Sequence, residues 1–136
     1  DKIIEKKVKS TIEKIFEQKG EVFFRKLEEE ITLEEIKKKN KVISLGGGAF
    51  MNKKIREYVV SHTKSFWLNL NMDLLTNRLA ISKKRPLLMN KNIKLTLAKI
   101  LNERKKTYSL ADYKIDCSNL NRDLIVNKIV KIYENE

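Results

Sequence analysis

The chain has 136 residues, a formal net charge of +12 and 41% hydrophobic residues, which suits one domain and is too apolar for a wholly disordered polyelectrolyte. No apolar run approaches the roughly 18 residues that a membrane-spanning helix needs, and residues 1–20 carry no hydrophobic signal core, so we expect a soluble cytoplasmic protein. One cysteine and one histidine exclude an internal disulfide and disfavour a zinc site, which takes about four ligands.

The first 40 residues are predicted to be helical. Apolar residues recur every three or four positions over 1–19, and the capping-box spacing of Ser10 with Glu13 predicts two short helices that meet near Ser10. A second amphipathic pattern covers 22–39 and predicts another helix, with a break expected near Thr32. We therefore expect a helical region before any strand.

A short apolar segment, 42–45, ends at three consecutive glycines and predicts a buried strand. The helical pattern resumes over 52–60, with Ile55 and Val59 expected to face inward. A strand followed by glycines and a helix brings backbone amides close to a ligand at the carboxyl end of a sheet. A glycine run is equally often only a tight turn, so the motif by itself leaves both readings open.

The second half of the chain alternates strands with helices. In order, the predicted elements are strand 65–70, helix 73–81, polar loop 83–92, helix 93–106, strand 113–117 and helix 123–133. The last helix is expected to turn Leu124, Ile125, Ile129 and Ile132 inward. This alternation predicts an α/β domain with a parallel sheet.

Several cationic residues are candidates for anion binding. Arg85, beside the rigid Pro86 in the polar loop, suits a closing lid that brings positive charge to phosphate, although a solvated arginine is the more ordinary interpretation. Arg25 and Arg104 are either surface residues or, if they converge, a bidentate clamp for a carboxylate. The lysines are spread through nearly every predicted helix, which favours a solvated surface over a nucleic-acid footprint.

Taken together and in order, short blocks across the whole chain resemble the shikimate kinase family. The blocks are DKIIE at 1–5, TIEKIF at 11–16, GEVFFRKLE at 20–28, SLGGGA at 44–49, RPLL at 85–88, NER at 102–104 and Tyr108. The resemblance implies an α/β P-loop fold of the nucleoside-monophosphate-kinase type, with three α/β/α layers and a parallel sheet. It also implies a kinase that moves the ATP γ-phosphate to the 3-hydroxyl of shikimate, giving shikimate 3-phosphate on the route to chorismate.

The resemblance also implies roles for residues that bind substrate. Asp1 resembles the aspartate that holds shikimate hydroxyls and is a candidate acceptor of the attacking hydroxyl's proton. Arg25 and Arg104 resemble the pair that grips the shikimate carboxylate. Gly47, with Gly46 and Gly48 beside it, resembles the backbone site that faces the substrate.

The resemblance implies fewer residues for the nucleotide side of the site. Arg85 resembles the lid arginine that reaches the ATP phosphates, and Arg78 with Asn121 and Arg122 matches positions that flank adenine. The phosphate loop, with its lysine and the ligands for Mg²⁺, is expected upstream of Asp1. As a lone polypeptide that starts at Asp1, the chain is therefore expected to lack turnover.

The resulting expectation is one kinase domain over 1–136, with substrate-binding helices at about 1–40, a lid loop at about 83–95 and no metal ligands of its own. The expected partners are shikimate and ATP, with no nucleic acid and no membrane, in a monomer. The alternatives are a non-catalytic remnant that binds shikimate only, a basic nucleic-acid-binding domain, and, ranked low, a related kinase such as gluconate kinase.

Overall fold

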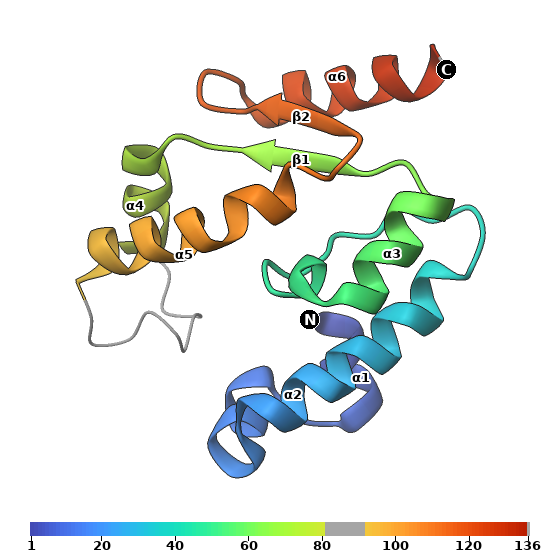
Figure 1. The fold of residues 1–136 in the computed structure, drawn as a ribbon, viewed down its shortest axis with the longest axis vertical. Helices are drawn as coiled ribbons and strands as arrows, with labels where there is room; N and C mark the ends of the chain where they lie inside the picture. Colours follow the sequence, from blue (N-terminus) through green and yellow to red (C-terminus); the bar gives the residue numbers. More distant parts are fainter. Residues whose placement is uncertain (81–91, 136) are drawn as a thin grey trace. The chain divides into compact units, whose positions relative to one another are not determined.

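The computed structural model describes residues 1–80 and 92–135. They belong to two compact units, a first unit of Asp1–Ser61 and a second unit of His62–Glu136. The elements follow in the order α1 (Lys2–Val8), α2 (Ile12–Ile36), the 3-10 helix η1 (Ala49–Met51), α3 (Lys53–His62), β1 (Phe66–Asn69), α4 (Met72–Ala80), α5 (Ile93–Tyr108), β2 (Tyr113–Asp116) and α6 (Arg122–Glu134) (Figure 1). The expected single domain stays a prediction.

The break between α1 and α2 is confirmed, and its cap lies one residue later than predicted. Lys9 ends α1 in the left-handed conformation, with φ of 52°. The cap of α2 is Thr11, whose side chain accepts a hydrogen bond from the backbone N of Lys14 at 3.3 Å. Ser10 and Thr11 both suit a cap, so the sequence fixes this boundary only to within a residue.

Gly20 divides α2 into two helical segments, because its φ of 76° and ψ of 174° are not helical. This region of backbone conformation is open essentially to glycine alone. The break predicted near Thr32 is wrong, since the helix continues to Ile36. One β-branched residue lowers helix propensity by only a few tenths of a kcal/mol, and the burial of Ile31 beside it holds the helix in place.

The strand predicted over 42–45 is also wrong. These residues have no regular secondary structure, and the side chain of Val42 is fully exposed. Within residues 1–80 and 92–135, the only ladder of strand hydrogen bonds joins β1 to β2. An apolar run reveals a tendency to form a strand, but a strand also needs a partner whose backbone groups pair with its own.

The core of the first unit lies between α1 and the two segments of α2. It is built from Ile4, Ile15, Phe24 and Ile31, each at most 5% exposed. The rings of Phe16 and Phe24 pack against each other across the kink, with centroids 4.7 Å apart and planes tilted by 41°. These contacts fix the direction of the second segment of α2, which carries most of the candidate site.

Helix α3 has the predicted inward face, because Ile55 is 0% exposed and Val59 is 5% exposed. The turn before α3 is tied to α2 through Asn52, whose amide donates to Glu29 at 2.6 Å. Arg56 donates to the carbonyl oxygens of Phe50 and Met51 at 3.1 and 2.9 Å. The glycine segment that precedes η1 is therefore held on its C-terminal side.

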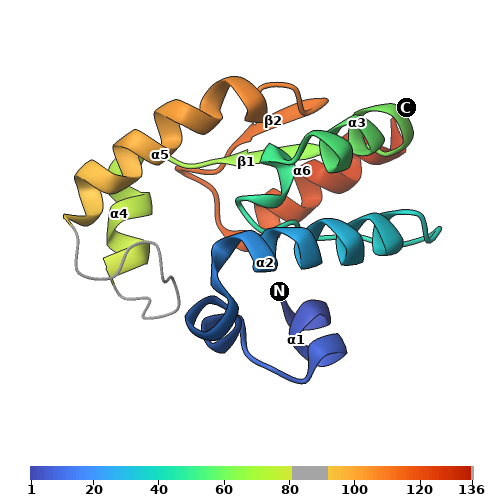
Figure 2. The ribbon, with the colours of Figure 1, turned by 60° about the horizontal axis from the view of Figure 1, so that its bottom comes forward.

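The second unit is a parallel pair of strands with helices on both sides, as the alternating pattern predicted. Phe66 of β1 lies opposite Tyr113 of β2, and the pairing runs to the end of both strands. Helices α5 and α6 lie on opposite sides of the pair in both views (Figures 1 and 2). The inward position expected for Leu124 is wrong, since its side chain is 50% exposed, whereas Ile125 is half-buried.

Among the described residues, none of the helices has the length and apolar character needed to cross a membrane.

Candidate active site

Two carboxylates from different elements lie against Gly46. Asp1 caps the start of α1, and Glu28 belongs to the second segment of α2 and is only 5% exposed. A Cβ placed on Gly46 would stand 3.2 Å from the Glu28 Oε1 and 3.5 Å from the Asp1 Oδ1. The structure thus brings Asp1 and Glu28 to Gly46, and contact of Asp1 with a substrate stays a prediction.

Gly48 lies against the guanidinium of Arg25. A Cβ on Gly48 would stand 2.8 Å from the Arg25 Cζ and 2.9 Å from Nη2, and closer still to Nη1. The φ of Gly48 is −93°, so its backbone is open to any residue and the need for glycine there comes from space. Arg25 therefore lies against the glycine run in the first unit, and its contact with a substrate carboxylate stays a prediction.

The turn itself is closed by backbone hydrogen bonds, in which the N of Ala49 donates to the carbonyl oxygen of Gly46 at 3.0 Å and the N of Met51 donates to that of Gly48 at 3.1 Å. Gly47 lies between these two bonded glycines. Such a turn places consecutive peptide groups beside the Asp1, Glu28 and Arg25 side chains, and the substrate-facing role of Gly47 stays a prediction.

Arg25 is held by two glutamates on its own helix. Its Nη1 donates to the Glu28 Oε2 at 2.6 Å, while its Nε and Nη2 both donate to the Glu21 Oε1, at 3.2 and 3.0 Å. Burial acts to lower the pKa of Arg25, but the hydrogen bonds and negative charges of Glu28 and Glu21 together outweigh it and raise the pKa above its ordinary value. The guanidinium therefore keeps its charge at every physiological pH.

Glu28 is the site residue that the sequence analysis did not single out. It lies four residues after Phe24 and three before Ile31, which are both buried core residues. A charged residue on the apolar face of a helix needs a partner, and Arg25 is that partner. This position in the apolar pattern is the signal that identifies Glu28 from sequence.

The remaining predicted site residues belong to the second unit. Arg104 is half-buried on α5, and its Nη1 lies 3.5 Å from the hydroxyl of Tyr108. Arg78 is exposed in the last turn of α4. The pairing of Arg104 with Arg25 across the two units stays a prediction.

Asn121 caps α6, because its side chain accepts a hydrogen bond from the backbone N of Leu124 at 2.9 Å. Arg122 follows it and is highly exposed, with its Nε 3.7 Å from the Asp123 carboxylate. The cap accounts for Asn121 as a structural residue. Contact of Asn121, Arg122 and Arg78 with a nucleotide stays a prediction.

Arg85 and most of the expected lid loop lie outside the described residues. In the part of the chain that the structure describes, no group of three or more His, Cys, Asp or Glu side chains is arranged to hold a metal ion.

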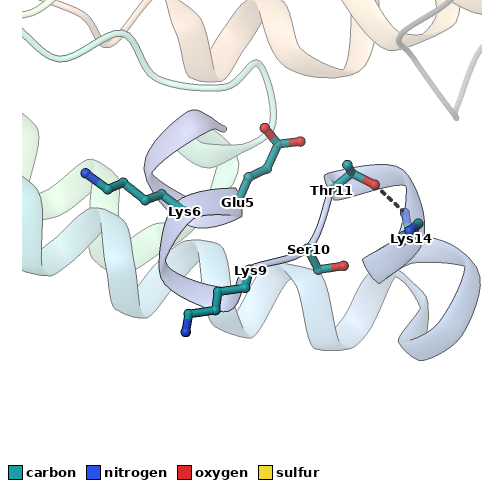
Figure 3. A pocket seen from close by; sticks show the side chains of 6 residues that line it. All are labelled: Glu5, Lys6, Lys9, Ser10, Thr11 and Lys14. Carbon is teal, nitrogen blue, oxygen red and sulfur yellow. Dashed lines mark hydrogen bonds between the residues drawn. The ribbon is translucent and has the colours of Figure 1, made fainter.

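A separate pocket of about 500 Å³ lies where α1 passes into α2, lined by Glu5, Lys6, Lys9, Ser10, Thr11 and Lys14 (Figure 3). None of the predicted site residues lines it. The Glu5 carboxylate accepts a hydrogen bond from the backbone N of Ile12 at 3.0 Å, which ties the two helices together. This pocket is distinct from the glycine-run site.

Comparison with protein families places the chain clearly. The family model described as shikimate kinase matches residues 1–134. Over 100 aligned residues, or 74% of this chain, the sequence is 37% identical to a shikimate kinase from Mesorhizobium japonicum and 39% identical to one from Bartonella quintana. These alignments cover 49% and 48% of the two relatives, so the chain spans about half the length of the curated relatives it matches.

Solved structures agree. Shikimate kinase from Acinetobacter baumannii in complex with shikimate has a TM-score of 0.90 and 33% identity, and the match covers 100% of this chain and 77% of that one. Shikimate kinase from Bacteroides thetaiotaomicron has a TM-score of 0.83 and 32% identity, covering 98% of this chain and 79% of that one. This likeness confirms the predicted α/β fold class, and the chain belongs to the shikimate kinase family.

Proposed function

We propose that the protein phosphorylates shikimate, transferring the γ-phosphate of ATP to the 3-hydroxyl and giving shikimate 3-phosphate, and that residues 1–61 carry most of the acid-binding side of its site. One observation carries the proposal. In a chain of this family, the carboxylates of Asp1 and Glu28 and the guanidinium of Arg25 gather around Gly46 and Gly48.

This cluster suits a small polyhydroxy acid. A guanidinium binds a carboxylate through two parallel hydrogen bonds, and carboxylates accept hydrogen bonds from hydroxyl groups. Arg25 therefore holds the acid group of shikimate, and Asp1 accepts the hydrogen bond of the hydroxyl that attacks. The shikimate bound to the Acinetobacter baumannii relative supports this choice of substrate.

Asp1 acts mainly by position. Phosphoryl transfer needs an attacking oxygen in line with the phosphate and positive charge around the transferred group. A carboxylate at Asp1 fixes the hydroxyl and receives its proton as the new bond to phosphorus forms. Several further points remain predictions. They are the use of Mg²⁺, the second carboxylate contact from Arg104, the monomeric state, the cytoplasmic location, and the roles toward ATP of Arg85, Arg78, Asn121 and Arg122.

The test is calorimetric titration of the complete protein with shikimate, followed by an assay of ADP formed on adding shikimate to protein, ATP and Mg²⁺. We expect saturable binding that is lost in Arg25→Ala and kept in Lys26→Ala, which removes a charge from the exposed neighbouring position. Absence of shikimate binding by the wild-type protein would refute the proposal. Binding that survives Arg25→Ala would refute the role given to Arg25.

A further inference from the structure

The hydrogen bonds of Arg25 leave a defined part of its guanidinium for a ligand. A guanidinium has five N–H groups, one on Nε and two on each Nη. Glu21 accepts from Nε and from Nη2 through a single oxygen, and Glu28 accepts from Nη1. After these contacts within residues 1–80 and 92–135, two N–H groups remain, one on Nη1 and one on Nη2.

These two N–H groups are carried by the pair of nitrogens that a carboxylate contacts in a bidentate complex. Their direction depends on the rotation of the guanidinium plane about the side chain of Arg25. Glu28 alone contacts one nitrogen and leaves that rotation open. Glu21 contacts two nitrogens on the opposite edge, and three contacts from two glutamates fix the plane.

We infer that Glu21 is a positioning residue for substrate binding, which holds the guanidinium of Arg25 in the plane that receives the carboxylate of shikimate. This inference rests on the proposed function. Glu21 acts through Arg25, because it accepts hydrogen bonds from Nε and from one N–H of Nη2. Its effect is therefore expected on substrate binding and not on the chemical step.

The fold places Glu21 for this role. Gly20, with φ of 76° and ψ of 174°, resets the chain direction so that Glu21 opens the second segment of α2. From there Glu21 reaches Arg25 one helical turn later, at the four-residue spacing at which side chains meet on a helix. The kink and the arginine clamp are thus parts of one local arrangement.

The test compares Glu21→Ala and Glu21→Gln with Glu30→Ala, a control that removes the same charge from an exposed position of the same segment. Each variant of the complete protein is titrated with shikimate and with its methyl ester, which lacks the carboxylate charge. Steady-state assays of ADP formation supply KM and kcat, and circular dichroism checks that each variant is folded.

We expect Glu21→Ala to weaken shikimate binding about fivefold, the size of an exposed ion pair, with a matching rise in KM, an unchanged kcat and unchanged binding of the ester. Glu21→Gln keeps an acceptor oxygen and should stay within about twofold of wild type, as should Glu30→Ala. Equal binding by Glu21→Ala and wild type, equal losses for acid and ester, or an equal loss in Glu21→Gln would overturn the inference. Failure of wild type to bind shikimate would instead refute the proposed function.

Discussion

Replacing Gly48 by alanine tests the packing of the candidate site directly. The new Cβ would lie 2.8 Å from the Cζ of Arg25 and 2.9 Å from its Nη2, inside ordinary van der Waals contact. The backbone of Gly48, at φ −93° and ψ −23°, accepts alanine without strain. The guanidinium at the end of the Arg25 side chain must therefore move, and this movement strains its 2.6 Å hydrogen bond to Glu28.

The energetic balance has two opposing parts. Alanine in place of glycine at a compatible backbone position stabilises a protein by about 0.4–1 kcal/mol, because the unfolded chain loses freedom. Loss of the partner of a buried carboxylate such as Glu28, which is 5% exposed, costs about 1–3 kcal/mol. We expect Gly48→Ala to destabilise the fold by about 1–2 kcal/mol and to weaken shikimate binding, because the guanidinium of Arg25 is displaced.

The assay is urea unfolding of wild type, Gly48→Ala, Arg25→Ala and the double variant. If the clash with Arg25 is the cause, Gly48→Ala loses its cost once Arg25 is absent, so the two changes are far from additive. Gly46→Ala is the matched comparison, because its Cβ would meet Glu28 at the longer distance of 3.2 Å and should cost less. An unchanged cost of Gly48→Ala in the Arg25→Ala background would refute this reasoning.

Three further predictions concern the first unit. Gly20→Ala should destabilise the fold by about 1–3 kcal/mol, since its backbone conformation is nearly closed to other residues; a free energy of unfolding equal to wild type would contradict this. Thr11→Ala should cost about 1 kcal/mol through loss of the helix cap, measured by urea unfolding with Thr11→Ser as the variant that keeps the cap. Hydrogen bonds from Lys38 and then Lys41 lower the pKa of Glu35 to about 2, so the stability that they give is present above the ordinary glutamate pKa and is lost as pH falls toward 2. In Glu35→Gln the free energy of unfolding should therefore change less with pH over that range. A pH dependence equal to that of wild type would argue against the ion pairs of Glu35 with Lys38 and Lys41.

The helices were predictable because their signal is local. Apolar spacing identified the elements around Ile4, Ile15, Phe24 and Ile55, all of which are buried. The segment 42–45 failed because its sequence shows β propensity but not the strand that would pair with it. The cap was predicted at Ser10 and lies at Thr11, because two adjacent hydroxyl residues give the same local signal.

The sequence predicted which residues gather in the candidate site better than it predicted how they are held there. The resemblance grouped Asp1, Arg25 and the glycine run, and the first unit brings these together. The resemblance did not indicate that Glu21 and Glu28 hold Arg25. Glutamate–arginine pairs three or four residues apart are common on helices, so their spacing alone does not show which of them lie in a site. The kink at Gly20 is the tertiary feature that decides the direction of the second segment of α2.

The carboxylates around Arg25 have a consequence for the end of the catalytic cycle. Asp1, Glu21 and Glu28 set three negative charges against one guanidinium in the first unit. Under the proposed function, the product gains a phosphate that carries roughly two negative charges. Like charges within a few ångströms repel, so these carboxylates oppose retention of the phosphorylated product and favour its departure.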